Sequence, residues 1–275
     1  MAIITLTTDY GNKDYSVSSL KAKLISEIDD INIVDITHDI SPFNLAEAGY
    51  VLEGAFSEFP KGTIHILSVD SELTPENKHI AIMYDGSFFI GADNGVFSLI
   101  FRDKKPDQIV EINLHSNYNY DISADELFVK VASHVNRSGP LNVVGSEIDT
   151  IKEITNLRPV INKEMNQIIG SVIYIDNYGN VVTNITEKLF KEISKTRPFT
   201  INARNVKFSK IHKNYSDAID FNLEKKDREE DGKKIALFNN LGYLQLSVYR
   251  SNPQTVGSAS TLFGLNYRDA VSVYF

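Results

Sequence analysis

The chain has 275 residues, no cysteine, and 28 Lys and Arg against 36 Asp and Glu, which gives a formal net charge of −8. This length suits two domains, and the hydrophobic fraction of 42% is sufficient for a sizeable core. The acidic balance argues against nucleic acid as a partner, because binding phosphates requires a basic surface. The lack of cysteine excludes disulfides, thiolate metal sites and cysteine nucleophiles.

The N-terminal segment has no basic stretch leading into a long apolar run, so it is typical of a first β-strand and not of a signal peptide. The chain also contains no run of 18 or more apolar residues, which argues against a membrane-spanning helix. We therefore expect a cytoplasmic protein with no membrane partner.

The first half of the chain alternates β-branched runs with helical patterns. Runs rich in Ile and Val predict strands at 2–7, 31–36, 63–69 and 79–84. Apolar residues at helical spacing predict helices at 14–28, 44–58 and 124–136. Strands that alternate with helices indicate βαβ units, so residues 1–150 are predicted to form an α/β domain with a mostly parallel sheet.

After Pro140 the pattern changes to short strands separated by turn signals. The predicted strands are 168–175, 180–185, 200–203, 234–238, 243–249 and 270–275. Such a pattern favours a small barrel or sandwich. We predict a crossing segment at 151–166 and an all-β, barrel-like domain at 167–275.

The segment 8–16 directly follows the first predicted strand, and ligands bind at the carboxyl ends of strands in open α/β sheets. Asp9 offers two acceptor oxygens, which suit a vicinal diol such as that of a ribose. Asp14 and Ser16 lie at the start of a predicted helix, where capping alone would explain an Asp. No glycine pattern typical of phosphate binding occurs in this segment.

Asp70 follows another predicted strand, where function and a simple turn are about equally good interpretations. The tripeptide 93–95 (Asp-Asn-Gly) is a turn signal that we interpret structurally. His134 lies on the apolar face of a predicted helix, a position more typical of a core histidine than of a catalyst. No histidine spacing indicates a metal site.

The segment 175–184 (IDNYGNVVTN) predicts a hairpin turn between two strands. It also carries groups suited to a nucleoside, because the Tyr178 ring can stack on a base and the Asn180 amide can pair with an adenine edge. Both interpretations are compatible, since a turn can present such side chains.

Taken together and in order, these segments resemble the S-adenosyl-L-methionine (SAM) hydrolase family, the SAM hydroxide adenosyltransferases, which are related to fluorinases and chlorinases. The family's Thr-Asp-Phe-Gly is similar to TDYG at 8–11, its Asp-Asn-Gly to 93–95, and its Ala-x-His to 132–134. Further matches are HDI-x-P at 38–42, FPKGTIH at 59–65 followed by Val-Asp at 69–70, and 175–184.

The resemblance implies a homotrimer with sites between one subunit's N-terminal domain and a neighbour's C-terminal domain. By position, Asp9 would hold the ribose diol, and Asp14, Ser16 and Asp176 would receive the amino-acid end of SAM. Phe43 would line the site, Tyr178 would stack on adenine and Asn180 would pair with its edge. Asn240 is a weaker candidate for the methionine carboxylate.

Asp70 and His134 would belong to the family's Asp-Arg-His set, which orients and activates water for attack at the ribose 5′ carbon. The products would be adenosine and L-methionine, and no metal or organic cofactor would be needed. Fluorinases resemble this family but carry Tyr at the position of Asp70, whose carboxylate would repel a halide, so a halogenase is the less favoured interpretation.

The family follows its Val-Asp with Pro-Gly-Val-Gly and, a few residues on, with the Arg of that set. In this chain Ser71 stands at the Pro, and the position of the Arg falls on Asn77. Without a guanidinium, hydroxide loses an electrostatic partner unless the neighbouring Lys78 turns inward. We therefore keep, beside the hydrolase, the alternative of a catalytically weak SAM- or adenosine-binding protein.

Overall fold

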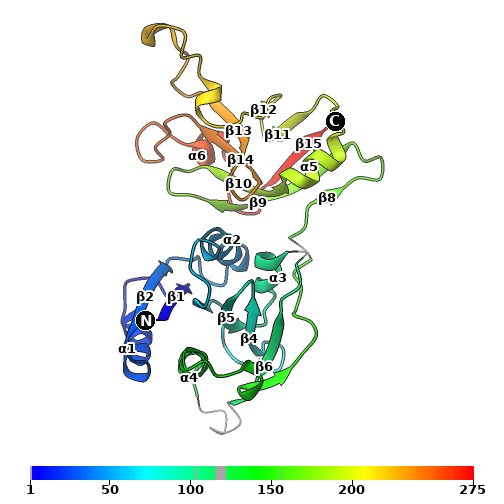
Figure 1. The fold of residues 1–275 in the computed structure, drawn as a ribbon. Helices are drawn as coiled ribbons and strands as arrows, with labels where there is room; N and C mark the ends of the chain where they lie inside the picture. The colour runs from blue at the N-terminus through cyan, green and yellow to red at the C-terminus, as the bar shows by residue number, and fades with distance from the viewer. Residues whose placement is uncertain (1, 103, 115–121, 156) are drawn as a thin grey trace. The chain divides into compact units, whose positions relative to one another are not determined.

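The computed structural model describes residues 2–102, 104–114, 122–155 and 157–275 (Figure 1). The chain divides into two compact units, Met1–Ile154 and Thr155–Phe275. Within the described ranges, no helix is both long and apolar enough to cross a membrane.

The first unit is built on a seven-stranded sheet with the order β2-β1-β3-β5-β4-β6-β7. The strands are β1 (Ala2–Thr8), β2 (Ile31–Thr37), β3 (Ile64–Ser68), β4 (His79–Tyr84), β5 (Ser87–Ala92), β6 (Gln108–Ile112) and β7 (Gly145–Glu147). The pairs among β2, β1, β3 and β5 are parallel, and those among β5, β4, β6 and β7 are antiparallel. The sheet is therefore mixed and not mostly parallel as expected.

The antiparallel half begins with the hairpin between β4 and β5. Tyr84 pairs with Ser87, and both intervening residues, Asp85 and Gly86, have positive φ angles of 49° and 74°. A two-residue turn of this kind can join only antiparallel strands.

Helices cover both faces of the sheet. They are α1 (Ser16–Glu27), α2 (Leu45–Phe56), α3 (Val96–Phe101) and α4 (Ala124–Asn136), followed by the 3₁₀ turn η2 (Leu141–Val143). Helices α1 and α4 contact each other, as do α2 and α3 (Figure 1). The core residues of α1 and α4 share a cluster with Ile64 and Ile66 of β3, whereas those of α2 and α3 share one with Leu67. This split follows from the alternation of side chains along a strand.

The second unit consists mainly of antiparallel strands in the order β12-β11-β15-β9-β10-β14-β13, with β8 also pairing with β9. The strands are β8 (Val160–Ile161), β9 (Gln167–Ile175), β10 (Val181–Thr186), β11 (Thr200–Ala203), β12 (Val206–Phe208), β13 (Lys234–Phe238), β14 (Tyr243–Val248) and β15 (Ala270–Tyr274). The helical segments are α5 (Glu187–Ser194), η3 (Ser216–Ala218), η4 (Lys225–Asp227) and α6 (Ala259–Phe263).

This second sheet curves around one core and nearly closes. Phe208 of edge strand β12 and Ala236 of edge strand β13 belong to the same apolar cluster. Beyond β12, the backbone N–H of His212 donates to the carbonyl of Ala236 over 2.8 Å. The two ends of the sheet therefore meet, which gives the unit a nearly barrel-shaped form.

Candidate functional site

The loops after β1 and β3 leave the sheet side by side. Thr8, the last residue of β1, pairs with Ser68, the last residue of β3. Because the two strands are parallel, Asp9 and Asp70 follow at the same edge. The structure therefore brings two of the predicted site residues onto neighbouring loops.

Asp9 is in direct contact with the segment that follows β2. Its Oδ2 accepts a hydrogen bond from the backbone N–H of Phe43 over 2.9 Å, and the N–H of Gly11 donates to the His38 carbonyl over 2.7 Å. Phe43 itself has a φ of 61° and a side chain that is 72% exposed. Asp9 and Phe43, which were predicted separately as site residues, are thus joined by a hydrogen bond at one corner of the unit.

Asp14 and Ser16 lie at the start of α1, and their contact is local. The backbone N–H of Ser16 donates to Asp14 Oδ1 over 2.9 Å. This hydrogen bond holds the pKa of the exposed Asp14 carboxyl below its usual value. The arrangement satisfies one of the free N–H groups at the helix start.

The backbone of Asp70 is held in a left-handed conformation with a φ of 47°. Two side-chain amides stabilise it. Asn94 Nδ2 donates to the carbonyls of Val69 and Asp70 over 3.0 and 3.2 Å, and Asn77 Nδ2 donates to that of Asp70 over 2.8 Å. Asn94 belongs to the Asp-Asn-Gly tripeptide, whose structural interpretation agrees with this role. The Asp70 carboxylate receives no hydrogen bond from the described residues.

Asn77 uses both of its amide hydrogens within the loop. Besides Asp70, it donates to the carbonyl of Glu72 over 3.0 Å. Both amide hydrogens of Asn77 therefore stabilise the turn. At the position expected for an Arg, this chain has a neutral side chain that supports the backbone of Asp70.

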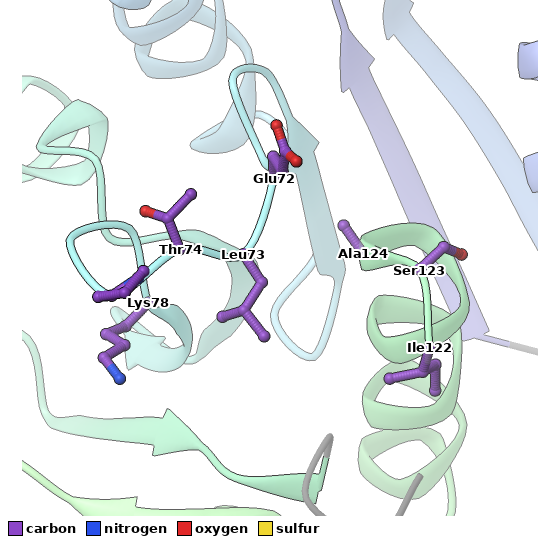
Figure 2. A pocket seen from close by; sticks show the side chains of 8 residues that line it. Glu72, Leu73, Thr74, Lys78, Ile122, Ser123 and Ala124 are labelled. Atoms are coloured by element: carbon purple, nitrogen blue, oxygen red, sulfur yellow. The ribbon is translucent and has the colours of Figure 1, made fainter. Parts of the chain in front are cut away.

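A pocket of about 650 Å³ opens beside this loop, between it and the N-terminal end of α4. Its lining residues are Glu72, Leu73, Thr74, Pro75, Lys78, Ile122, Ser123 and Ala124. Figure 2 shows the Leu73 side chain pointing into the space between the loop and the helix. Lys78 also lines the pocket.

His134 lies at the other end of α4. It is nine residues after Asp125, which at 1.5 Å per residue corresponds to roughly 13 Å along the helix axis. Its Nε2 contacts the carbonyl of Pro140 over 3.0 Å, and Pro140 lines a second pocket together with Ala2 and Ile64, the first residues of their strands. The structure thus places His134 at the opposite edge of the sheet from Asp70 and does not bring the two together.

The residues of α4 that reach the Asp70 loop are those of its first turn. Tyr10 donates to Asp125 Oδ1 over 2.7 Å and contacts Ser68 Oγ over 2.7 Å. Ser68 Oγ in turn lies 2.9 Å from Ser71 Oγ and 3.2 Å from Asp125 Oδ1. Sequence reasoning missed this hydroxyl–carboxylate cluster, although Tyr10 and Ser71 stand where the family motifs have Phe and Pro.

In the second unit, the turn before β10 is organised by Asp176. Its Oδ1 accepts from the backbone N–H groups of Tyr178 and Asn180, both over 2.9 Å, and its Oδ2 accepts from Asn180 Nδ2 over 2.8 Å. Gly179 has a φ of 73°, which a hairpin turn requires. The turn leaves Tyr178 66% exposed and buries Asn180.

Asn240 lies away from this turn. It is exposed in the connection between β13 and β14, where the Gly242 carbonyl accepts from the N–H of Glu187, just after β10 ends. Because Asp176 and Asn180 come just before β10 begins, Asn240 and the turn lie at opposite ends of this strand.

Comparisons with known proteins agree with this arrangement of the chain. The model of the SAM hydroxide adenosyltransferase N-terminal domain matches residues 4–145, and that of the C-terminal domain matches residues 170–272. A protein of Methanocaldococcus jannaschii named (R)-S-adenosyl-L-methionine hydrolase is 29% identical over 99% of this chain and 96% of that protein. A fluorinase of Actinopolyspora mzabensis is 22% identical and covers 66% of this chain and 71% of that protein.

The fold is also similar to that of a solved structure. An uncharacterized conserved protein from Thermotoga maritima aligns with a TM-score of 0.78 and 26% identity, over 99% of this chain and all of that one. The two family models together span most of the sequence, in the order that the motifs predict. The chain therefore belongs to the SAM hydroxide adenosyltransferase family.

Proposed function

We propose that this protein hydrolyses S-adenosyl-L-methionine to adenosine and L-methionine. The observation that carries the proposal is the side-by-side exit of the Asp9 and Asp70 loops from paired strand ends. One carboxylate is then available for a ribose diol and the other for the water that attacks C5′. The hydrolase names of relatives from Methanocaldococcus jannaschii and Thermus thermophilus support the same reaction.

The chemistry requires alignment more than activation of the substrate. A sulfonium is a good leaving group, so the protein must hold a water oxygen in line with the departing sulfur. Asp70 is suited to orient that water, because its backbone is fixed by Asn94 and Asn77 while its carboxylate remains open to a ligand. The reaction as proposed uses no metal or organic cofactor.

The remaining site residues would bind the two ends of SAM. Asp14, Ser16 and Asp176 would receive the methionine end, Phe43 would line the site, and Tyr178 and Asn180 would contact adenine. Asn240 stays the weaker candidate. His134 is left out of the reacting centre, because its position at the far end of α4 separates it from Asp70.

We further propose a homotrimer in which each site combines the first unit of one subunit with the second unit of a neighbour. The exposed side chains of Phe43 in the first unit and Tyr178 in the second support an arrangement that covers both. Sedimentation or light scattering should then give three times the monomer mass of 30.9 kDa.

A catalytically weak SAM- or adenosine-binding protein is the second candidate. It is favoured by one specific observation, the commitment of both Asn77 amide hydrogens to backbone carbonyls where the family has an Arg. A halogenase is less favoured, since the carboxylate of Asp70 would repel a halide.

Incubation of the purified protein with SAM in water enriched in ¹⁸O separates these candidates. The hydrolase should release adenosine and methionine in equal amounts, with the label in the 5′ oxygen of adenosine. Asp70→Asn should bind SAM, measured by calorimetry, without releasing adenosine, whereas the exposed Asp149→Asn should behave as wild type. Binding without adenosine release by the wild type would favour the second candidate, and a 5′-chloro nucleoside formed in chloride would favour a halogenase.

A further inference from the structure

Three hydroxyl groups and one carboxylate form a continuous chain behind the Asp70 loop. The successive oxygens are Ser71 Oγ, Ser68 Oγ, Tyr10 Oη and Asp125 Oδ1, separated by 2.9, 2.7 and 2.7 Å. Ser68 is fully buried, and the other three are partly buried. The chain joins three parts of the first unit, namely the loops after β1 and β3 and the first turn of α4.

The direction of these hydrogen bonds follows from the Asp125 carboxylate at the end of the series. An ionised carboxylate can only accept, so Tyr10 must donate to Asp125. Its oxygen then accepts from Ser68, which in turn accepts from Ser71. Each hydroxyl has one proton, so this order uses all three and leaves a lone pair of Ser71 Oγ as the acceptor at the open end.

We propose that this chain carries the proton of the attacking water to Asp125 during the hydrolysis proposed above, on which the inference rests. The water oxygen forms a bond to C5′ as the C5′–S bond breaks, and the sulfur leaves with the electron pair as neutral methionine. The proton released from the water moves to Ser71 Oγ, whose own proton moves to Ser68, that of Ser68 to Tyr10, and that of Tyr10 to Asp125. The products are adenosine, methionine and a protonated Asp125, which returns its proton to solvent.

The positions of the four hydrogen-bonded residues in the sequence support this role. Ser71 directly follows Asp70, which would orient the water, and Tyr10 directly follows Asp9, which would hold the ribose. Tyr10 and Ser71 supply hydroxyls at positions where the motifs that this sequence resembles have Phe and Pro. The relay also provides a proton acceptor at the edge where neither His134 nor an Arg at position 77 is present.

The environment of Tyr10 keeps its proton on the oxygen at rest. Burial, followed by the charge of Asp125, raises the pKa of the Tyr10 phenol well above its usual value. A neutral phenol is the state that a relay needs, because it can give one proton to Asp125 while it takes another from Ser68. Ser68 Oγ also reaches Asp125 directly, at the longer distance of 3.2 Å.

This geometry predicts an order of effects among conservative variants. Ser71→Ala removes the open end and Asp125→Asn removes the acceptor, so each should lower kcat for adenosine formation by about 100-fold, the range for loss of a general base, with KM for SAM within about twofold of wild type. Tyr10→Phe should lower kcat by a smaller factor, because Ser68 Oγ still contacts Asp125 Oδ1. The double variant Ser71→Ala/Asp125→Asn should be no slower than the slower single variant, because both interrupt one pathway.

The matched control is Tyr84→Phe, the same chemical change at the end of β4 in the same unit, which should leave kcat unchanged. Thermal unfolding of each variant identifies any that fail to fold. If Asp125→Asn fails to fold, Asp125→Glu takes its place, and because it keeps the carboxylate it should retain more than half of the wild-type activity. A Ser71→Ala variant with wild-type kcat, or variants that raise KM while kcat stays constant, would overturn the relay. A wild-type protein that forms no adenosine would instead overturn the proposed function, so the two failures can be told apart.

Discussion

Asn94→Ala tests whether the turn at Asp70 depends on one buried amide. Asn94 is 8% exposed and makes three hydrogen bonds: its Nδ2 donates to the carbonyls of Val69 and Asp70, and its Oδ1 accepts from the N–H of Val96 over 3.2 Å. The Asp70 carbonyl keeps its bond from Asn77, so the two groups that lose a partner are Val69 C=O and Val96 N–H. At about 1–2 kcal/mol for each buried group left without a partner, the variant should lose about 2–4 kcal/mol of unfolding free energy.

The assay is urea unfolding of wild type and variant followed by circular dichroism, with the free energy taken from the transition of the first unit. Asn222→Ala, a change of the same residue type at an exposed position of the second unit, should shift stability by less than about 0.5 kcal/mol. Asn94→Asp keeps the acceptor and the shape but places a charge against two carbonyls, so it should be at least as destabilising as Asn94→Ala. A loss below about 1 kcal/mol for Asn94→Ala would refute the reasoning, because the turn would then hold without its amide.

Three further predictions concern other parts of the molecule. Burial lowers the pKa of His65 from 6.5 to about 4, so between these values the unfolded chain binds more protons than the folded one. The free energy of unfolding should therefore fall by about 2 kcal/mol from about pH 7.5 to about pH 5, and His65→Gln should largely remove this loss. Gly179→Ala should destabilise the second unit by more than about 2 kcal/mol in thermal denaturation, because the added Cβ would lie 2.2 Å from Ser258 Oγ. Gly232 has a similar φ and open space around it, so Gly232→Ala should lower the free energy of unfolding by only about 1 kcal/mol. Tyr178→Ala should raise KM for SAM about tenfold at unchanged kcat if the exposed ring stacks on adenine, and an unchanged KM would contradict that role.

The parallel half of the first sheet was predictable because its strands are β-branched runs separated by helices. The antiparallel half departs from this alternation, because β4 and β5 follow each other with no helix between them. The turn Asp85-Gly86 between the runs 79–84 and 87–92 is a hairpin signal of the strongest kind, and it reverses the chain within two residues. The two-residue turn therefore makes β4 and β5 antiparallel, although the alternation of strands and helices elsewhere in the domain predicts a parallel sheet.

The candidate site was predictable only where a residue's place depends on the end of a strand. Asp9 and Asp70 follow strands whose carboxyl ends meet at one edge, so their proximity follows from the parallel topology alone. A helix gives no such information, because a motif that matches α4 does not say which end faces the site. His134 matches the motif but lies at the distant end, while Asp125, about 13 Å away along the helix, reaches the Asp70 loop.

The departure at position 77 is best understood together with the cluster behind Asp70. An Arg would bring a positive charge beside the nucleophile, whereas Asn77 stabilises the backbone that presents Asp70. Loss of that charge makes a water harder to deprotonate, so a chain that still hydrolyses its substrate needs a proton acceptor from elsewhere. The hydroxyls of Tyr10 and Ser71, absent from the family motifs, connect the Asp70 loop to a carboxylate that can serve as one. The two departures are therefore consistent as a single exchange, in which a cation that stabilises hydroxide is replaced by an acceptor for the proton of the attacking water.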